Sequence, residues 1–579
     1  MYLRRSGTTA SKSGESYWQL VESVRTERGP RQRLVAYLGE IGSPASRLGV
    51  KLAAEGFVEG QTWRDRQLFD EDLAPEWARV DTKRVAVERF RDFGGPWLLL
   101  QVLERLGLTQ WLDSVVERGQ EEVAWSIVAL VLVIMRVCNP SSELHIAECL
   151  YERTALEDLL GLPADKVNDD RLYRALDKIL PHKAALEKHL KERLGELFGV
   201  EYDLLLYDVT STYIEGTGAS NEQMLRGYSR DQRSDCKQVC IALVVSRCGL
   251  PLGYEVFDGN RLDVTTVQEI VTKIESSYGK ADRIWVMDRG MVSEANVAFL
   301  REGDRRYILG ASRSSLRQFE QKLLSGKWQS VREGLDVQLC PTDDGSETFV
   351  LCRSRDRREK EKAMHERFEK RIEEGLTVMA AGCAKSKIAS GVLQRRIGAL
   401  LSKNSRASKL FQVEVVSRPE GGCSVVWTKD EGRRKWSELS EGCYLLRTNI
   451  SDWKPDDLWK AYVQLTEAES AFRIHKSDLK LRPIWHQTKE RTQAHILVCF
   501  LGYVTWKALG QFCKASGLGD EPRQIFDELA QIKMVDVVLR TDEGKRIRRR
   551  CIAEPTKAQK VLLDRMHLKL PRQLKLQEM

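Results

Sequence analysis

Two short, almost purely apolar runs constrain the fold more than any other feature of this sequence, because each carries an aspartate. Leu204 to Thr210 contains Asp208, and Ile284 to Gly290 contains Asp288. Apolar runs of this length are typical of strands that are covered on both faces, as in α/β folds. A carboxylate in such surroundings is costly unless a cation or a metal ion compensates it. The pattern therefore predicts an α/β core in which the two aspartates are candidate metal ligands.

A third candidate carboxylate, Glu469, lies in the stretch from Ala461 to Lys476. This stretch contains no Pro or Gly and has apolar residues at helical spacing, so we expect one continuous helix. Steps of seven, four and three residues would place Tyr462, Glu469, Arg473 and Lys476 in one stripe along it. Two interpretations stay open. The stripe is either a metal-binding carboxylate flanked by phosphate-holding side chains, or the polar face of an amphipathic helix with internal ion pairs.

These residues resemble those of the DDE transposases of bacterial insertion sequences, and more closely the insertion-sequence-four family. That family has a Tyr-x2-Arg-x3-Glu-x6-Lys signature. Tyr462, Glu469 and Lys476 match its spacing, whereas Leu465 occupies the Arg position. We expect Arg473, four residues after Glu469, to take over the missing phosphate contact. The stretches similar to the subgroup typified by insertion sequence sixteen-thirty-four are YDVTSTYIEG, GYSRDQRSDCKQV, GLPLGYEVFDGN, VMDRG and AESAFRIHKSDLKLRPIWH.

The order of predicted elements after Glu201 is that of a ribonuclease H-like fold: three strands, then helix, strand, helix and strand, and finally the helix with Glu469. In that fold the first and fourth strands are neighbours, so Asp208 and Asp288 are expected to converge. The predicted strands are Tyr202 to Thr210, Lys237 to Ser246, Leu252 to Phe257, Arg283 to Asp288 and Arg305 to Leu309, and the predicted helices are Val264 to Ser277 and Ser293 to Leu300.

Changes of pattern along the chain predict a multidomain α/β protein. An Arg-rich hairpin of Tyr17 to Val24 and Arg31 to Leu38 comes first, and Val85 to Phe198 is predicted to be helical throughout. A structureless loop between Gly310 and Trp453 is implausible, so this segment is predicted to be an inserted domain, as in the resembled family. The predicted regions are 1–50, a basic hairpin; 85–200, a helical DNA-binding domain; 201–310, the first part of the ribonuclease H-like core; 311–454, a β-rich insertion; 455–515, the second part of the core; and 516–579, a basic C-terminal region.

Clusters of cations outside the core are candidate DNA contacts. A helix capped by Asn168 follows a short helix from Ala155 to Leu160, and this order is compatible with a helix-turn-helix. The same cations would also suit a solvated face or a charged strand edge, and both alternatives stay open. The candidate contacts are Arg171, Arg174 and Lys178 on the capped helix and Arg548, Arg549 and Arg550 in the tail, beside Tyr462, Arg473 and Lys476.

Composition sets weaker limits on location and partners. Lys and Arg total 92 against 84 Asp and Glu, and this net charge of +8 permits nucleic-acid binding without arguing strongly for it. The N-terminus lacks the apolar core of a signal peptide, and Val123 to Met135 is too short to span a bilayer, so we expect no membrane partner. The 13 Cys include no CxxC pair, which favours reduced thiols over a zinc site. His486 and His495 are interpreted as core or hydrogen-bonding residues.

An Asp-Asp-Glu set without His or Cys suits Mg²⁺ or Mn²⁺, because these ions prefer oxygen ligands. Two such ions about 4 Å apart can activate the attacking oxygen and stabilise the leaving oxygen of a phosphodiester. We therefore predict a cytoplasmic, nucleoid-associated transposase that binds terminal repeats as a homodimer on double-stranded DNA, cleaves the element ends and joins them to target DNA. The alternatives are a ribonuclease H-like nuclease that does not join, and a catalytically inactive DNA-binding protein.

Overall fold

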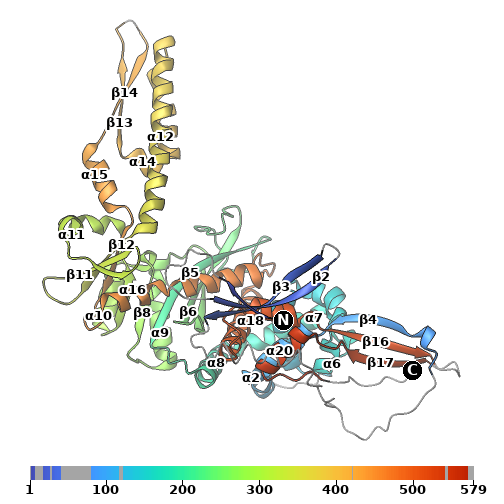
Figure 1. The fold of residues 1–579 in the computed structure, drawn as a ribbon. Helices are drawn as coiled ribbons and strands as arrows, with labels where there is room; N and C mark the ends of the chain where they lie inside the picture. The colour runs from blue at the N-terminus through green and yellow to red at the C-terminus, as the bar shows by residue number, and fades with distance from the viewer. Residues whose placement is uncertain are drawn as a thin grey trace. The chain divides into compact units, whose positions relative to one another are not determined.

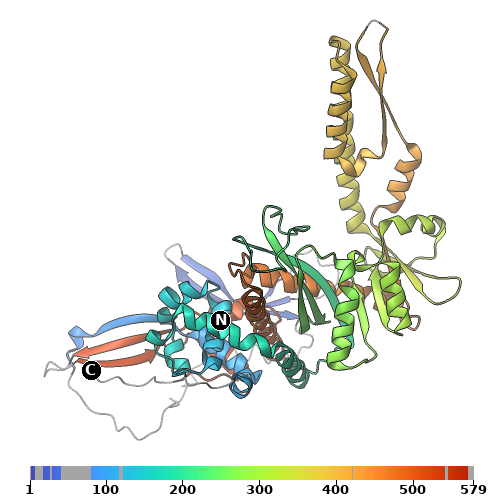
Figure 2. The same cartoon turned by 180° about the vertical axis from the view of Figure 1, so that it is seen from behind.

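The chain forms two compact units in the computed structural model, drawn in Figures 1 and 2. Unit 1 comprises Met1–Ala281 and Thr466–Met579, and unit 2 comprises Asp282–Leu465. The structure describes residues 2–6, 17–26, 29–40, 80–116, 121–419, 421–540 and 546–571. Both units combine helices with β-sheet, which confirms the predicted mixed α/β class in this coarse form.

The centre of unit 1 is an antiparallel arrangement of three long strands. Nearly every side chain of the first two strands is buried, whichever face it points to. Helices cover these strands, and α17 packs on the first two of them. The apolar runs therefore predicted these strands and their burial. The elements are β5 (Leu204–Ile214), β6 (Lys237–Ser246), β7 (Pro251–Asp258), α9 (Val267–Tyr278), α17 (Thr466–Arg473) and the π-helical turn η9 (Ile474–Asp478).

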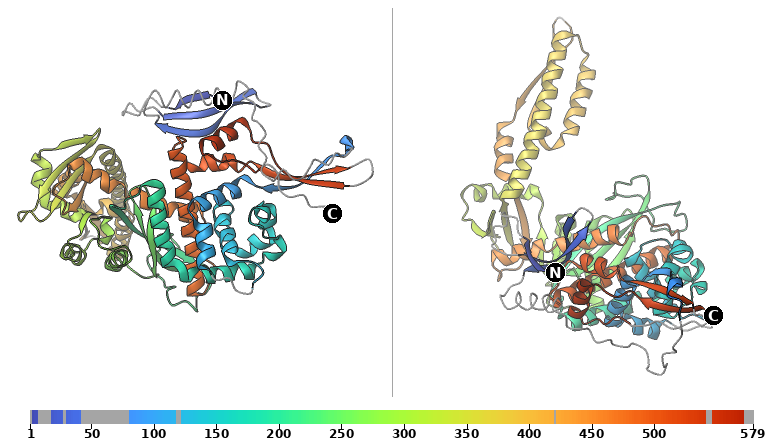
Figure 3. Two further views of the ribbon diagram at one scale, coloured as in Figure 1. Left: turned by 90° about the horizontal axis from the view of Figure 1, so that it is seen from below. Right: turned by 45° about the vertical axis from the view of Figure 1, so that its right-hand side comes forward.

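One long apolar helix, α18 (Lys489–Ala515), lies at the centre of the helical part of unit 1 and packs against several other helices. It contacts α2, α4 and α7, which come from the N-terminal half of the chain (Figure 3, left). Its length and composition would suit a membrane span, but 83% of that window is buried inside the protein, as in a core helix. The helices around it are α2 (Gly94–Arg105), α3 (Leu108–Val115), α4 (Trp125–Cys138), α5 (Glu143–His145), α6 (Leu156–Leu160), α7 (Asp169–Ile179), α8 (Lys183–Phe198), α19 (Pro522–Leu529) and α20 (Lys557–Arg565).

The prediction that Val85 to Phe198 is helical throughout is wrong at its start. Ala86–Asp92 forms strand β4, which pairs with β16 (Lys533–Arg540), and β16 in turn pairs with β17 (Arg546–Ile552). The partner of β4 lies over 400 residues away in the sequence, so no local sequence pattern could predict this pairing. The predicted N-terminal hairpin is confirmed as β2 (Tyr17–Thr26) and β3 (Gly29–Glu40), with β1 (Tyr2–Ser6) added beside β2.

Unit 2 begins with a parallel β-α-β element. β8 (Ile284–Met287) and β9 (Arg306–Gly310) pair in parallel, and α10 (Glu294–Glu302) connects them. Antiparallel strands extend the sheet beyond β9 in the order β15, β12, β11 and β10. The further elements are β10 (Gln329–Arg332), β11 (Leu335–Pro341), β12 (Thr348–Ser354), β15 (Cys443–Thr448), α11 (Glu320–Ser325) and α16 (Pro455–Val463).

A second module of unit 2 has its own hydrophobic core. Its longest element is α12 (Arg355–Lys385), whose residues Ile372 and Leu376 are fully buried against the β-hairpin that runs alongside it (Figure 1). Exposed i,i+4 ion pairs, such as Lys362 with Glu366, support this highly charged helix. The segment predicted to be β-rich therefore also has a large helical part. The other elements are α13 (Ser390–Lys403), α14 (Ser405–Ser408), β13 (Phe411–Ser417), β14 (Cys423–Lys429) and α15 (Glu431–Ser440).

Candidate active site

Asp208 and Glu469 both lie in unit 1, on elements that pack against each other. Asp208 is half-buried in β5, where its Oδ1 accepts a hydrogen bond from the backbone N–H of Val209 at 2.8 Å. Glu469 lies on α17, the helix that packs on β5 and β6. Packing of this helix on this strand brings the segments that carry the two carboxylates together, although the sequence separates them widely.

Glu469 and its near neighbour Glu467 have different surroundings. The Glu469 side chain is exposed and has no hydrogen bond or ion pair to any residue that the structure describes. Glu467 instead forms an ion pair with Lys507 of α18, at 3.0 Å. A carboxylate without a protein partner is available to a metal ion, whereas Glu467 is already compensated. The contrast favours Glu469 as the candidate ligand on this helix.

Asp288 lies in unit 2, at the end of β8 and at the N-cap of the 3-10 turn η7 (Arg289–Met291). The Tyr462 hydroxyl donates a hydrogen bond to Asp288 Oδ1 at 3.4 Å. Burial and the charge of Asp288 both raise the pKa of Tyr462, so its hydroxyl stays protonated and remains a donor. In this structure Tyr462 is therefore a partner of the aspartate, a role that its place in the signature does not reveal.

Sequence reasoning missed Gly310, which allows this arrangement. A Cβ atom at Gly310 would lie 2.5 Å from the Tyr462 hydroxyl and 2.9 Å from the Arg289 amide nitrogen. Any side chain at this position would therefore displace Tyr462 or the backbone that follows Asp288. The position of Gly310 at the end of β9 could have been a signal, because glycine within a strand often marks close approach of another segment.

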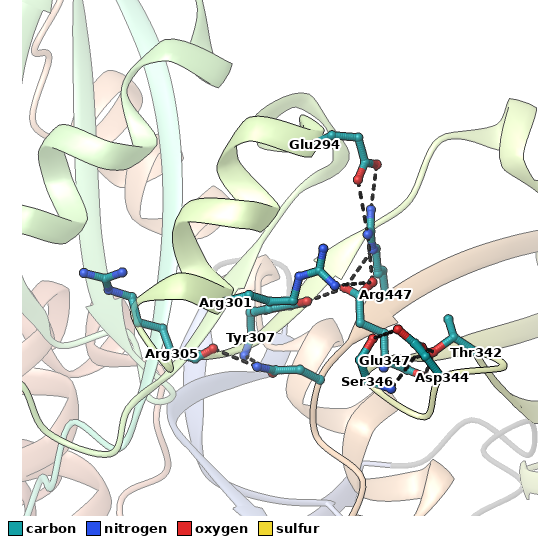
Figure 4. A network of polar contacts seen from close by, with 10 residues as sticks. Glu294, Arg301, Arg305, Tyr307, Thr342, Asp344, Ser346, Glu347 and Arg447 are labelled. Atoms are coloured by element: carbon teal, nitrogen blue, oxygen red, sulfur yellow. Dashed lines mark hydrogen bonds and ion pairs between the residues drawn. The ribbon is translucent and has the colours of Figure 1, made fainter.

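A polar network in unit 2 supports the turn that follows Asp288 (Figure 4). Arg447 of β15 donates to Glu347 at 2.7 Å and to Glu294, the first residue of α10, also at 2.7 Å. Tyr307 of β9 donates to the same Glu347. Because Glu347 and Arg447 are largely buried, the charge-assisted bond between them is a strong one, whereas the Glu294 side chain is 80% exposed. These contacts tie the start of α10 to β9 and β15, so the segment between β8 and α10 is held at both ends.

The predicted continuous helix from Ala461 to Lys476 is wrong. α16 ends at Val463 and α17 begins at Thr466, so Tyr462 and Glu469 lie on different helices. No Gly or Pro causes this break. Leu465, which occupies the Arg position of the signature, is only 7% exposed at the junction. The four-residue stripe is therefore not a feature of one helix.

Arg473 remains an exposed cation one turn after Glu469. Its Nη2 donates to the hydroxyl of Ser470 at 3.2 Å. Among the residues that the structure describes, it forms no ion pair with Glu469. The alternative in which an i,i+4 ion pair merely supports the helix is therefore not observed, and the predicted phosphate contact stays a prediction.

Lys476 is engaged inside the protein instead of projecting freely toward a ligand. Its Nζ lies 2.9 Å from Asp231 Oδ1, and the same oxygen pairs with Arg482. Burial lowers the pKa of Lys476, while Asp231 opposes that effect. The Asp231 side chain is only 3% exposed, so its negative charge needs the cations that it contacts. Lys476 thus has a structural partner that its place in the signature did not predict, and its predicted DNA contact stays untested.

His475 makes this part of the protein sensitive to acid. Its ring is buried and donates Nδ1–H to the carbonyl of Ala471 at 2.8 Å, and burial lowers its pKa to about 4. In the unfolded chain a His has a pKa near 6.5. Between about pH 4 and pH 6.5 the unfolded chain therefore binds more protons at His475 than the folded chain does. We expect the unfolding free energy to be unaffected by His475 above pH 6.5 and to fall by roughly 3 kcal/mol as the pH drops to about 4.

Denaturant unfolding at pH 7 and pH 5 tests this expectation. His475→Gln should show a shallower loss of stability on acidification, since it removes the titrating group. The control is His145→Gln, at an exposed histidine, which should follow the unmodified protein. An equal pH dependence for His475→Gln and the unmodified protein would contradict the prediction.

The helix predicted to contact DNA forms as α7, and its three cationic side chains differ in whether they contact other protein groups. Asn168 caps α7 by accepting a hydrogen bond from the Arg171 amide at 2.8 Å, and the Arg171 side chain donates to the carbonyl of Lys166. Arg174 pairs with Asp170 at 2.9 Å, with both side chains mostly exposed. Lys178 is exposed on the same helix. The apolar face of α7 packs against α4 and α18, so these cations remain at the surface.

The arginines of the basic tail lie on β17, and adjacent ones point to opposite faces of the strand. Arg550 is only 11% exposed and contacts Asp158 at 2.6 Å and Asp536 at 2.9 Å. Arg548, on the same face, pairs with Glu88 at 3.3 Å. In the structure these two residues therefore have carboxylate partners, and their predicted phosphate contacts stay untested. Arg549 lies on the other face and remains a candidate contact. The side chains of the predicted N-terminal Arg hairpin lie outside the described residues.

Comparison with known proteins places the core in a family. Residues 200–505, more than half of the chain, match a family model described as "Transposase DDE domain". No curated protein matches the chain. Among solved structures, a cryo-EM structure of the piggyBac transposase synaptic complex with hairpin DNA is similar. The identity is 10% and the TM-score 0.34, and the alignment covers 79% of this chain and 82% of that one.

Proposed function

The chain belongs to the transposase DDE domain family, and from that membership we propose that it is the transposase of an insertion sequence. The observation that carries the proposal is the match over residues 200–505, because this span contains all three candidate carboxylates. The finer assignment, to the insertion-sequence-four family and the subgroup typified by insertion sequence sixteen-thirty-four, rests on the signature around Glu469.

The proposed metal ligands are Asp208, Asp288 and Glu469. Their chemistry fits Mg²⁺ or Mn²⁺, since all donors are carboxylate oxygens, and Glu469 has no partner among the described residues. Two bound ions would activate the attacking oxygen and stabilise charge on the leaving oxygen. Tyr462 would hold Asp288 in a fixed orientation by donating its hydroxyl proton, and this role requires the small residue at Gly310.

The proposed partner is double-stranded DNA, at the element ends and at the target. Exposed cations support this proposal in unit 1, where Arg473, Arg174 and Lys178 project from helices. We further propose a homodimer on DNA and a location at the bacterial nucleoid. Backbone-contacting cations would provide affinity, and the carboxylates would provide the chemistry.

A strand-transfer assay tests the function. The purified protein is incubated with Mg²⁺, a labelled duplex that ends in the inverted repeat flanking the gene, and a supercoiled target plasmid. Joined products, together with cleavage at the repeat, are the expected result. Cleavage without joined products would identify a nuclease, and DNA binding without metal-dependent cleavage would identify an inactive DNA-binding protein.

We expect Arg473 to contact a DNA phosphate beside Glu469. Its planar guanidinium can donate two parallel hydrogen bonds to phosphate, and an ammonium cannot reproduce that geometry. Loss of a charge-assisted bond worth about 2 kcal/mol should reduce cleavage by Arg473→Ala about 30-fold. The cleavage rate of Arg473→Lys should lie between those of the unmodified protein and Arg473→Ala.

Cleavage rates and unfolding free energies of both variants separate this role from a structural one. Because Arg473 is exposed, stability should change by less than about 0.5 kcal/mol. Normal cleavage by Arg473→Ala, or a loss of activity that parallels a loss of stability, would refute the phosphate contact.

A further inference from the structure

Three potential metal ligands from distant parts of the chain meet inside unit 1, and none of them belongs to the proposed active site. Glu143 is the first residue of α5, His486 precedes α18, and His495 lies within α18. One ligand atom from each of them lies within 4.8 Å of the others. Glu143 and His495 are buried, and the His486 side chain is 8% exposed. Neither the transposase signature nor the carboxylate chemistry uses this cluster.

The distance between His486 and Glu143 is long for a hydrogen bond but suits two ligands of one ion. His486 Nε2 lies 3.5 Å from Glu143 Oε1, whereas a good hydrogen bond of this kind is about 2.7–3.2 Å. Around a tetrahedral Zn²⁺ with bonds of about 2.1 Å, neighbouring ligand atoms are about 3.4 Å apart. The observed separation is therefore close to an edge of such a tetrahedron.

His495 provides the second, independent observation. Its Nε2 lies 3.2 Å from the carbonyl oxygen of Leu481 and 3.9 Å from Cys499 Sγ, and since a carbonyl only accepts, the shorter contact assigns the proton to Nε2. The lone pair then resides on Nδ1. This atom is buried and has no hydrogen-bond partner among the residues that the structure describes. A buried lone pair without a partner is costly, and coordination of a metal ion would satisfy it.

Arg136 of α4 completes the surroundings. Its Nη2 is 4.0 Å from Glu143 Oε1, and both side chains are buried. Ligating carboxylates usually have such an outer partner that fixes their orientation. The charge of Arg136 also weighs against a second cation. The competing arrangement is therefore a direct contact between His486 and Glu143 without metal.

We propose that Glu143, His486 and His495 bind one structural Zn²⁺ ion. Two imidazoles and one carboxylate suit Zn²⁺ and do not suit Mg²⁺ or Ca²⁺, which prefer oxygen ligands throughout. The ion would join α5 of the N-terminal helical region to α18. This inference goes beyond the proposed transposase function, because it concerns how the helical region is held and not how DNA is cut.

Metal analysis of the full-length protein tests the proposal. The protein is expressed in zinc-supplemented medium, purified without chelator and dialysed, and its zinc is measured by mass spectrometry. We expect about one Zn²⁺ per chain, and less than about a tenth of that in His486→Ala and Glu143→Gln. The matched control is His145→Ala, at the exposed histidine that ends α5, which should retain the metal.

X-ray absorption at the zinc edge of the unmodified protein keeps the test decisive even if a variant fails to fold. Two imidazole nitrogens with oxygen ligands support the site, whereas thiolate ligands overturn it. Zinc well below one per chain in the unmodified protein, or unchanged zinc in a folded His486→Ala, also overturns it. None of these measurements depends on DNA cleavage, so failure of the zinc site and failure of the transposase proposal are distinguishable.

Discussion

Replacing Asp208, Asp288 or Glu469 individually with Ala is expected to abolish DNA cleavage and to leave binding to the element ends largely intact. Metal ligands act on the transition state, whereas cations that contact phosphate supply affinity. Losing several kcal/mol of charge stabilisation at the metal corresponds to roughly a 10³-fold or greater fall in rate. Cleavage of a labelled end duplex and gel-shift binding, measured on the same preparations, check the two halves of the prediction.

Glu467→Gln is the matched control for Glu469→Ala, because both residues lie in the first turn of α17. Glu467 is paired with Lys507, so its replacement should affect stability slightly and cleavage little. Metal-dependent cleavage that survives in Asp208→Ala, Asp288→Ala or Glu469→Ala would remove that residue from the proposed site. Equal losses for the Glu467 and Glu469 variants would assign both effects to damage of the helix.

The sequence predicted the strands of the core well because each strand is itself a run of consecutive apolar residues, and such a run indicates burial. A run such as Lys237–Ser246 is apolar over nearly its whole length, and the observed strand has the predicted bounds. β4 was missed for the opposite reason. Its residues mix charged and apolar side chains without a clear period, and it becomes a strand by pairing with β16, far along the chain. Tertiary pairing overrides weak local preference in such a segment.

The candidate site shows the same division between local and distant causes. The signature around Glu469 can be recognised in the sequence. In the structure α17, which carries Glu469, packs on β5. The break between α16 and α17 at Gln464 and Leu465 could not be predicted, because both residues favour helix and no Gly or Pro lies there. The pairing of Lys476 with Asp231 was equally hidden, since 245 residues separate the two partners. Which cations are free to bind DNA therefore depends on three-dimensional contacts.

Arg550 illustrates that dependence, and its loss should cause the largest change in stability among the tail arginines. Arg550→Gln would leave Asp536, whose side chain is 1% exposed, without its direct partner, and would weaken the compensation of Asp158. Removing one member of a buried ion pair costs about 3–5 kcal/mol. The lower end is expected here, because Arg91 remains 3.3 Å from Asp158. Denaturant unfolding, followed by circular dichroism, measures the difference.

Arg549→Gln is the matched control, one residue away on the opposite face of the same strand. This variant should keep its stability and, if Arg549 contacts DNA phosphate, should reduce the slope of log affinity against log salt by about one. Arg550→Gln should show the reverse pattern at temperatures where it stays folded, with the slope unchanged because its charge is already neutralised by two carboxylates. A stable Arg550→Gln with a flattened salt dependence would show that this side chain leaves Asp158 and Asp536 to bind DNA, and would reverse the structural assignment.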